Sequence, residues 1–408
     1  MQENNKALSG ITVIDLSQFL AGPSCTLSLG MLGADVIKVE RPVVGEQGRN
    51  DNRKYVYGEQ NLKWAIFHSN KRSVTLDLKN EEGQKLLERL IRIGDIVVEN
   101  YAPGTIERLG FDYERIRSIN PRCIFCQIKG YSEYSPYADY PGMDGPIQAS
   151  AGLASQTGLE DSQPVISGVP LADAPAGDYA LSGILAALYQ REKTGRGQHV
   201  RINMQEVVLA YSRASFVNQD RAPKRGGAML FSGEQAPRNM FPCKPDYEGD
   251  ENNYVFLMVR DTPGQKMWHS FCEVIDRMDL FEDPRFLNGP LRLKNVEALE
   301  TEVKKWTTAH PKTEVMRLLC EKMIPAGATL TIPDICKDQG MYESGFLQKM
   351  NHPTLGEITL PASALHLSDS PVTMTPSPDL GNGNEAVYKG LLGMSDEEYN
   401  ACIAKKII

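Results

Sequence analysis

The chain has 408 residues and carries 44 Lys and Arg against 52 Asp and Glu, so its formal net charge is −8. A single hydrophobic core is uncommon at this length, and we expect two or three domains. The acidic balance argues against a dedicated nucleic-acid-binding protein, but it does not exclude an anionic small molecule, because such a ligand responds to local charge.

Strand and helix signals alternate from the start of the chain. The β-branched run 11–16 predicts a buried strand, Pro23 begins a helix that Gly33 ends, and 35–39 predicts a second strand. A strand, a helix and a strand in so short a stretch form a βαβ unit, which implies a parallel sheet. The alternation continues with strands predicted at 73–78, 95–99, 123–128 and 198–203, and helices at 80–93, 113–119, 174–193 and 205–218.

The composition of the chain changes at Gln219. Residues 219–253 are rich in Gly, Pro, Asn, Asp and Lys without a clear period, which is typical of a crossover or linker. The sequence therefore predicts an α/β domain followed by a smaller α+β domain. The later elements are predicted as a strand at 254–259, helices at 264–275 and 296–308, short strand-like pieces over 331–368 and a helix at 395–404.

No segment predicts a membrane span or export. The longest compact apolar stretch, 183–189, is far below the roughly 20 residues that span a bilayer. The opening MQENNKALSG lacks the basic and apolar regions of a signal peptide. The cysteines are sparse and show no spacing pattern, which is typical of a reducing compartment, so we expect a cytoplasmic protein.

Motifs for metals and redox cofactors are weak. The first βα turn, 17–23, holds one glycine where the dinucleotide fingerprint needs three, and Pro23 removes a backbone N–H near the pyrophosphate position. The histidines lie far apart, and no Walker loop occurs. Cys123 and Cys126 are three apart in a predicted strand, so they point to opposite faces. We therefore expect neither a metal nor a prosthetic group.

Asp173 stands immediately before the long apolar helix predicted at 174–193. Aspartate is a preferred N-cap, and Pro175 in the first turn agrees with that structural role. A carboxylate at a helix start is also kept ionised by the helix dipole, and an ionised, rigidly held carboxylate can act as a covalent nucleophile. Capping and catalysis are compatible, and the local pattern leaves both open.

Basic residues gather in the first third of the chain despite the acidic total. In an open parallel sheet, ligands bind at the carboxyl ends of the strands, where Arg41, Lys79 and Asn100 are predicted to lie. Each charge taken alone is ordinary solvated surface, whereas together they favour a pocket for a ligand with several phosphates. The basic residues near predicted strand ends are Lys38, Arg41, Lys71, Arg72, Lys79, Arg108 and Lys129.

Several blocks in order give the chain an end-to-end resemblance to one family. They are LSGITVIDLSQFLAGPSCTLSLGMLGADVIKVERP, NKRSVTLDLKNEEG, VVENYAPGTIERLGFDYERIRSINPRCIFCQIKGY, ILAALYQREKTGRGQHVRINM, IPAGATLTIPDI, HPTLGEITLP and LLGMSDEEY. The chain thereby resembles the class III CoA-transferase family, the group that contains formyl-CoA and carnitine CoA-transferases. Independent blocks in the right order are far more specific than any one short motif.

The resemblance implies a fold, a division into domains and an assembly. The family fold has a large Rossmann-like parallel-sheet domain and a smaller α+β domain in a ring-shaped chain, and two chains interlock as a homodimer. The implied large CoA-binding domain comprises 1–218 together with 340–408, and the small domain with its linkers comprises 219–339.

The resemblance also implies an activity and a site. The activity is transfer of CoA from an acyl-CoA donor to a carboxylic acid acceptor, with coenzyme A and acyl-CoA as substrates. Asp173 matches the catalytic aspartate, which forms a mixed anhydride and then an aspartyl-CoA thioester. Asp144 matches a carboxylate near the active site, and Arg41 and Arg108 are the expected phosphate partners. Positions matched to CoA contacts are Leu20, Ala21, Arg41, Leu76, Lys79, Asn100, Arg108 and Met204.

The chain departs from the formyl-CoA transferase branch in three places. That branch has a mobile glycine run over the intermediate, which neither 226–227 nor 233–239 reproduces. The aromatic residues of the oxalate pocket are not evident around 49–63, and both departures argue against oxalate as the acceptor. Pro141 stands where a lysine is expected, so that contact is not carried over.

Two other functions are consistent with the same fold. A 2-methylacyl-CoA racemase of this family needs a histidine beside the aspartate, but the matching segment here is Gly142-Met143-Asp144. A non-catalytic subunit of a heteromeric transferase would be expected to lack the catalytic aspartate, and Asp173 is present. The transferase is therefore the leading hypothesis.

Overall fold

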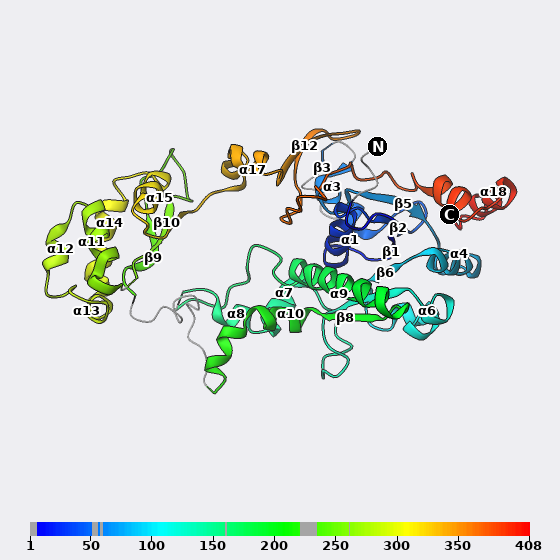
Figure 1. The fold of residues 1–408 in the computed structure, drawn as a ribbon, viewed down its shortest axis with the longest axis horizontal. Coiled ribbons are helices and arrows are strands. Elements are labelled where there is room, and N and C mark those ends of the chain that lie inside the picture. Colours follow the sequence, from blue (N-terminus) through cyan, green and yellow to red (C-terminus); the bar gives the residue numbers. More distant parts are fainter. Residues whose placement is uncertain (1–5, 51–55, 58–59, 160, 221–234, 261) are drawn as a thin grey trace. The chain divides into compact units, whose positions relative to one another are not determined.

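The computed structural model describes residues 6–50, 56–57, 60–159, 161–220, 235–260 and 262–408. The chain forms two compact units, the first built from Met1–Arg225 with Tyr342–Ile408 and the second from Gly226–Met341. The ribbon in Figure 1 traces both units along the sequence.

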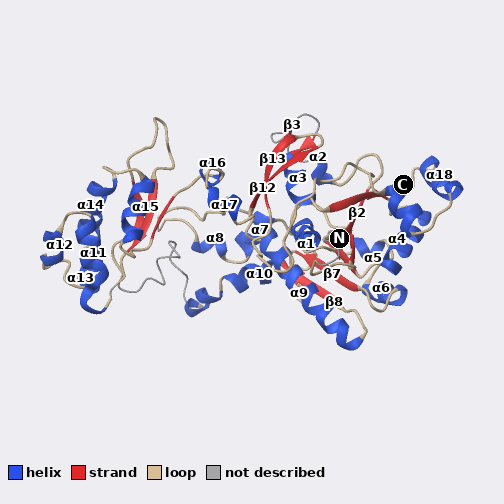
Figure 2. Cartoon of the chain, turned by 45° about the horizontal axis from the view of Figure 1, so that its top comes forward, coloured by secondary structure: helices blue, strands red, loops and turns tan. Residues whose placement is uncertain are grey.

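The first unit is organised around a six-stranded sheet whose neighbouring strands all run parallel (Figure 2). Its strand order, β5-β2-β1-β6-β7-β8, reverses direction beside β1, as in doubly wound α/β folds. The predicted α/β class with a parallel sheet is confirmed. The strands are β1 (Thr12–Asp15), β2 (Asp35–Glu40), β5 (Lys71–Thr75), β6 (Ile96–Glu99), β7 (Ile124–Lys129) and β8 (His199–Asn203).

Helices cover both faces of this sheet, which is why its strands read as continuous apolar runs. Val13 packs into a core with α1 and α9, whereas the adjacent Ile14 packs into a second core with α4 and α6. Cys126 lies in the first core and Cys123 in the second, so their predicted separation onto opposite faces is confirmed. The main helices are α1 (Ala21–Met31), α4 (Glu81–Ile93), α6 (Tyr113–Ile119) and α9 (Asp173–Thr194).

Several short elements between these helices were not predicted, because each is too brief to show a period. They are α2 (Gln47–Asn50), β3 (Val56–Tyr57), β4 (Gln60–Asn61), α3 (Leu62–His68), α5 (Thr105–Arg108), α7 (Asp144–Ser150) and α8 (Leu153–Gln156). The single helix predicted at 205–218 is wrong in its length. Helix α10 (Met204–Tyr211) ends early and a 3₁₀ helix follows at Arg213–Asn218, where Phe216 and Val217 are exposed and bury no apolar stripe that would extend α10.

The C-terminal segment returns to the first unit and covers the edge strand β5. Gly383 N donates to Ser73 O at 2.8 Å, and the Tyr388 hydroxyl donates to Thr75 O at 2.7 Å. Tyr388 and Ile407 join the second core. An exposed parallel edge would leave backbone groups unpaired, and this segment satisfies them. It contains β12 (Leu347–His352), β13 (Gly356–Pro361), a π-helix at Glu385–Leu391 and α18 (Asp396–Ala404).

The second unit has an antiparallel sheet of order β11-β10-β9 with a core of its own. Trp268, Phe271 and Phe286 are fully buried in it. Strand β9 lies in the segment predicted to be a linker, so that prediction is wrong there, because pairing with β10 rather than a local pattern defines it. The last helix, α17 (Gln339–Glu343), includes the point in the chain where the second unit ends and the first resumes. The other elements of the second unit are β9 (Arg238–Pro242), β10 (Tyr254–Met258), α11 (Lys266–Val274), α12 (Met278–Glu282), α13 (Gly289–Lys294), α14 (Val296–Thr307), α15 (Lys312–Glu321), β11 (Ala326–Ala328) and α16 (Ile332–Ile335).

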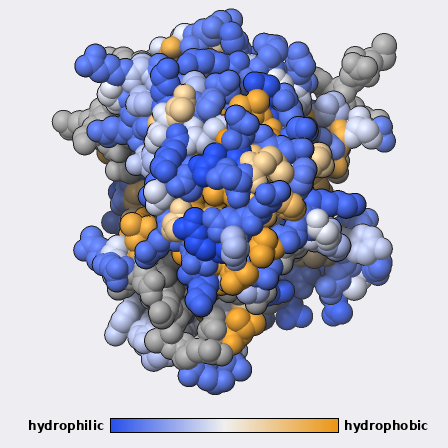
Figure 3. Space-filling model, turned by 90° about the vertical axis from the view of Figure 1, so that its left-hand side faces the viewer, coloured by the Kyte–Doolittle hydropathy of each residue, from blue (hydrophilic) through white to orange (hydrophobic). Residues whose placement is uncertain are grey.

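Among the described residues, no helix is long and apolar enough to cross a bilayer. On the face of the molecule drawn in Figure 3, hydrophilic residues predominate and hydrophobic ones form small groups between them.

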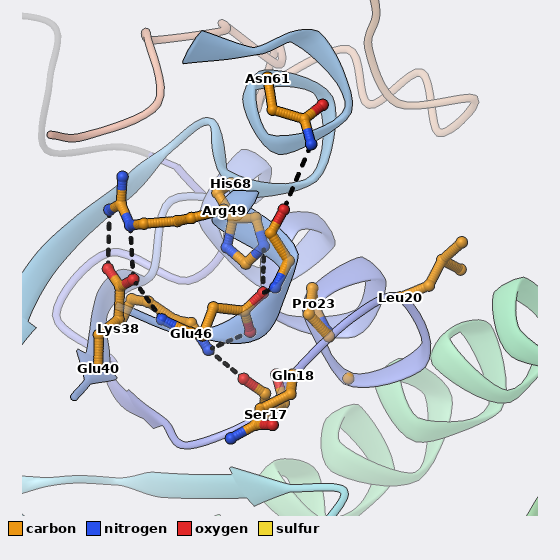
Figure 4. A network of polar contacts seen from close by, with 12 residues as sticks. Ser17, Gln18, Leu20, Pro23, Lys38, Glu40, Glu46, Arg49, Asn61 and His68 are labelled. Carbon is orange, nitrogen blue, oxygen red and sulfur yellow. Dashed lines mark hydrogen bonds and ion pairs between the residues drawn. The ribbon is translucent and has the colours of Figure 1, made fainter. Parts of the chain in front are cut away.

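A cluster of buried charges lies at the carboxyl ends of β1 and β2 (Figure 4). Lys38 Nζ lies 3.8 Å from Asp15 Oδ1 and 3.4 Å from Glu46 Oε2, and it also donates to Ser17 O. Lys71 Nζ reaches the same Asp15 carboxylate at 3.1 Å. Two of the basic residues predicted near strand ends, Lys38 and Lys71, are therefore internal counter-ions and do not face a phosphate-bearing ligand.

The pKa values in this cluster follow from burial and pairing. Burial raises the pKa of Asp15, but Lys38 and Lys71 outweigh that effect and hold its pKa below the usual range. Burial lowers the pKa of Lys38, and Asp15 and Glu46 reverse the effect, so that its pKa is raised. Lys38 is therefore charged at neutral pH and is the cation that joins two acidic side chains.

Replacing Lys38 by Met tests how much of the fold depends on this cation. Lys38→Met leaves Asp15 and Glu46 without their shared partner, and we expect a loss of about 3–5 kcal/mol in the free energy of unfolding. Urea unfolding followed by circular dichroism measures it. The exposed Lys85 on α4 provides the matched control, since Lys85→Met is expected to stay within about 0.5 kcal/mol of wild type. Equal urea midpoints for the two variants would contradict this prediction.

Candidate active site at the start of helix α9

Asp173 is the first residue of α9, and Ala172 occupies the N-cap position without a side-chain cap. The capping acceptor comes instead from Asp144, whose Oδ2 accepts from Ala172 N at 2.8 Å and from Asp173 N at 3.0 Å. Gln148 Nε2 holds the other oxygen of Asp144 at 2.5 Å. Of the two roles that the local pattern left open for Asp173, the capping role is therefore not the one observed. A cap supplied from so far along the chain leaves no local sequence signal.

The carboxylate of Asp173 is thus free of capping and lies in a half-buried position. The pKa of this carboxyl is raised to about 6, mainly by burial and also by the negative charge of Asp144, while the positive charge of Lys63 opposes both effects. At neutral pH the group is mostly ionised yet poorly solvated. A desolvated carboxylate of raised basicity is a stronger nucleophile than one in water.

Close packing of α9 on α1 fixes where Asp173 lies. A Cβ on Gly177 would come within 2.8 Å of Ala21 O and 2.9 Å of Ser24 Cβ, so only glycine allows the two helix starts to approach this closely. Ala21 is itself buried, and Leu20 is the N-cap residue of α1. These two predicted site residues therefore lie at the start of α1, beside the start of α9.

A cleft of about 740 Å³ opens at the carboxyl ends of β2, β5 and β6. This is the edge of a doubly wound sheet where ligands bind, and the volume is enough for a large cofactor-like molecule. Four predicted site residues line it, namely Arg41, Leu76, Lys79 and Asn100. Asn100 also has a structural role, because its amide accepts from Gln18 N at 2.7 Å and donates to Gln18 O at 2.8 Å.

The other predicted residues do not line this cleft. Arg108 is exposed on α5 and donates to Thr105 Oγ1 at 2.8 Å, and Thr105 does line it. Met204 is buried at the start of α10 in the core beneath α9. Asp173 is the first residue of α9, and Asp144, the first residue of α7, contacts it there. The structure therefore brings the predicted residues together in two neighbouring groups, one in the cleft and one at α9, with the β1–α1 turn common to both.

Sequence reasoning missed part of the cleft wall. Phe19 has a φ of 62° and lines the cleft beside Gln18. Val43 is 81% exposed and Val44 51% exposed on the loop after β2, and both line the same cleft. The sequence signal that could have indicated Val43 and Val44 is a pair of branched apolar residues in the loop that follows a predicted strand. Lys406 reaches the cleft from the C-terminal segment, and no local pattern indicates that contact.

No metal site accompanies this arrangement in the part of the chain that the structure describes, since no three His, Cys, Asp or Glu side chains lie close enough there to hold an ion. The chemistry available at the site is that of a nucleophilic carboxylate beside a ligand cleft on an α/β sheet. This combination is typical of a covalent acyl-transfer enzyme.

Comparison with known proteins gives the family. The model of CoA-transferase family III matches residues 8–384, and the chain belongs to that family. Formyl-CoA:oxalate CoA-transferases of Streptomyces avermitilis and Streptomyces coelicolor are each 38% identical over 410 residues, covering 96% of this chain and 97% of theirs. The crystal structure of a CAIB/BAIF family protein from Brucella suis superposes with a TM-score of 0.83 at 28% identity, covering 95% of this chain and all of that one.

Two predictions are confirmed by these matches. The predicted family is the one found, and the chain is a class III CoA-transferase that acts on acyl-CoA and a carboxylate. The racemase alternative is not favoured, since the relatives named above are transferases.

The raised pKa of Asp173 predicts a pH-dependent cost in stability. Because the folded-state pKa, about 6, exceeds the ordinary 3.8, the ionised group opposes folding above pH 6, and the penalty disappears as pH falls toward 3.8. We expect Asp173→Asn to raise the free energy of unfolding by roughly 1–3 kcal/mol at pH 7.5. Near pH 4 the variant and wild type should be alike.

Urea midpoints at pH 4, 6 and 7.5 measure this effect. Asp369→Asn, at an exposed position, is the matched control and is expected to show no pH-dependent gain. A gain for Asp173→Asn that is equal at all three pH values would show that the substitution acts through packing and not through charge.

Proposed function

We propose that Asp173 is the covalent nucleophile of this CoA-transferase. The observation that carries the proposal is a desolvated carboxylate, not used as a helix cap, beside a cleft of cofactor size. Asp144 positions it by holding the two backbone N–H groups at the start of α9.

The reaction proceeds in balanced steps. A carboxylate oxygen of Asp173 attacks the thioester carbon of the donor, the C–S bond breaks, and CoA leaves as a thiolate from the resulting mixed anhydride. The thiolate attacks the Asp173 carbonyl, which releases the donor acid and leaves an aspartyl-CoA thioester. The acceptor carboxylate attacks that thioester to give a second anhydride, and the thiolate then takes the new acyl group and frees Asp173. No water is consumed, and water would hydrolyse both the anhydrides and the thioester, so the transfer requires that water be excluded from Asp173.

The cleft is the proposed site for the CoA moiety. Arg41 and Lys79 line it and provide positive charge for phosphates, with Arg108 beyond its rim. Leu76 and Asn100 belong to its wall, and Leu20, Ala21 and Met204 stay predicted contacts. We assign the CoA-binding role to the unit built from both chain ends, for which 1–218 with 340–408 is predicted, and the small-domain role to the unit that covers most of 219–339.

Formyl-CoA and oxalate are the first donor and acceptor to test, because the curated relatives are named for that pair. The missing glycine run and the missing aromatic residues of the oxalate pocket argue against oxalate as the acceptor. The candidate glycines 226–227 lie outside the described residues, as do 233–234 and the parts of 49–63 at 51–55 and 58–59. A panel of acids is therefore needed alongside oxalate.

We further propose a cytoplasmic, interlocked homodimer. The first unit is built from two separate chain segments, so the chain leaves it once and returns once, as threading requires. The described cysteines form no disulfide, which suits a reducing compartment. Light scattering coupled to size-exclusion chromatography measures the oligomeric state, and a monomer would overturn the dimer.

The covalent step has a direct test. Wild-type enzyme incubated with formyl-CoA and quenched in acid is expected to carry a CoA adduct on the peptide that contains Asp173, detected by mass spectrometry. Asp173→Ala should lose the adduct and at least about a thousandfold in kcat, since covalent catalysis is removed. Transferase turnover retained by Asp173→Ala would overturn the mechanism. Racemisation of a 2-methylacyl-CoA without an acceptor acid would replace it with the racemase.

The phosphate contacts are tested by shortening the substrate. The double variant Arg41→Gln with Lys79→Gln should raise KM for acyl-CoA by about tenfold or more, because each charged contact contributes about 1 kcal/mol or more. Acyl-pantetheine lacks the nucleotide phosphates, so its KM should be the same for the variant and wild type. An equal rise for both substrates would place these side chains elsewhere than at the phosphates.

A further inference from the structure

Lys406 is a cation of the large cleft that the mechanism above does not use. It lies in the short segment after α18 and lines the cleft together with Arg41 and Lys79. Its side chain is exposed, and among the described residues no ion pair or side-chain hydrogen bond engages its ammonium group. The ammonium is therefore available to an anion that enters the cleft.

The backbone at Lys406 has the left-handed conformation, with a φ of 57°. Helix α18 ends here in a Schellman motif, because Lys406 N donates to Ile403 O and Ile407 N donates to Cys402 O, both at 2.9 Å. Glycine is favoured at this position of the motif, since it has no Cβ to oppose a left-handed backbone. Lysine therefore costs stability here, and such backbone outliers are typical of ligand sites.

Contacts on both sides of Lys406 hold its backbone at one place on the cleft wall. The Ile407 side chain is buried in the second core, and Ile407 O accepts from Asp77 N in the loop after β5 at 2.8 Å. Lys405 Nζ lies 2.9 Å from Glu82 Oε1 on α4, and Figure 2 shows α18 beside that helix. The two adjacent lysines thus have different surroundings, since Lys405 pairs with α4 and Lys406 lines the cleft.

Lys79 belongs to the same end of the cleft. It follows β5 in the loop that Ile407 contacts, where Lys79 N donates to Asp77 Oδ1 at 3.0 Å. Like Lys406, it is exposed and lines the cleft. Two cations from segments far apart in the chain therefore meet beyond the carboxyl end of β5.

The buried carboxylates of the cleft wall are already engaged by other cations. Glu40 Oε2 lies 2.6 Å from Arg49 Nε, and Glu46 Oε2 lies 3.4 Å from Lys38 Nζ. These pairs leave the exposed cations of the cleft to balance a ligand and not the wall.

The order of the strands gives the direction in which CoA would lie. Strand β5 is at one edge of the six-stranded sheet, whereas α9 packs on β7 and β8 toward the other edge. The sulfur of CoA must reach Asp173 at the start of α9, so the nucleotide at the opposite end of the molecule is directed toward β5. The 3′-phosphate of that nucleotide is a phosphomonoester and carries close to two negative charges at neutral pH.

We infer that the Lys406 ammonium binds the 3′-phosphate of CoA, so that the segment after α18 distinguishes CoA from its form without this phosphate. Lysine binds phosphate as a point charge and needs no bidentate geometry, which suits a flexible side chain on a fixed backbone. The inference rests on the proposed transferase function and adds a residue and a ligand group to its binding site.

Wild-type enzyme tests the inference without any substitution. Isothermal titration calorimetry compares CoA with 3′-dephospho-CoA, which lacks only the 3′-phosphate. We expect CoA to bind about tenfold more tightly or better, the scale of charge-assisted contacts to one phosphate. Equal dissociation constants overturn the inference and leave the transferase function standing. Absence of binding for both ligands overturns the proposed function itself.

Variants then assign the effect to Lys406. Lys406→Gly should raise the dissociation constant of CoA by about fivefold and leave that of 3′-dephospho-CoA unchanged. Its thermal midpoint should equal or exceed that of wild type, because glycine fits the left-handed position, and this separates lost binding from lost folding. Lys406→Arg should bind CoA nearly as wild type does, because it keeps the charge.

The neighbouring lysine provides the matched control. Lys405→Met removes a positive charge next to Lys406 that pairs with Glu82 instead, and it should bind both ligands as wild type does. An equal loss of affinity for CoA and 3′-dephospho-CoA in Lys406→Gly would show that Lys406 shapes the cleft and does not contact the 3′-phosphate, which overturns the inference.

Discussion

The ion pairs that Lys38 makes with Asp15 and Glu46 are the constraint on which the site depends. Strands β1, β2 and β5 and the loop after β2 each have a charged side chain in this cluster, which is closed to solvent. Helix α3 contacts it through His68, whose pKa burial lowers well below the usual value, so that the ring is neutral. A charge with little exposure to water keeps its partners at fixed distances, because separation would leave an uncompensated buried ion. Electrostatic attraction between these buried groups therefore holds the wall of the large cleft and helix α3 in place, in a region where the strands have ended and no longer provide hydrogen bonds.

The carboxylate at α9 is placed by a different force, the close packing of helix on helix. Glycine at position 177 lets α9 approach α1, and Asp144 satisfies the backbone donors that Asp173 leaves unpaired. The result is a buried acid with a raised pKa, which costs stability at neutral pH and gains nucleophilicity. A nucleophilic carboxylate requires this conflict between local stability and reactivity. Asp173 differs in this respect from Asp15 in the buried cluster, whose pKa is lowered by its lysine partners.

Much of the architecture could be predicted because buried parallel strands and amphipathic helices leave strong local patterns. The strands around 12–15, 35–40 and 96–99 are rich in buried Val and Ile, and α4 places Leu86, Leu87, Leu90 and Ile91 on one face. Strand β9 and helix α3 escaped prediction, since β9 depends on pairing with β10 and α3 has only seven residues. Of the candidate site, the strand-end residues Arg41, Lys79 and Asn100 could be placed at the cleft by the rule that ligands bind at carboxyl ends of parallel strands.

The sequence by itself determined the class of fold, the family and the position of Asp173, the proposed nucleophile, because these follow from periodicity and from ordered motif blocks. Only the tertiary structure decided which charges face a ligand. Lys38 and Lys71 look like Arg41 and Lys79 in the sequence, yet the first pair is buried against Asp15 and the second lines the cleft. It also decided that Asp144 and not Asp173 caps α9. The reason is that the burial of a charged side chain and the identity of its ion-pair partner depend on contacts between segments far apart in the chain, and no local sequence pattern indicates these contacts.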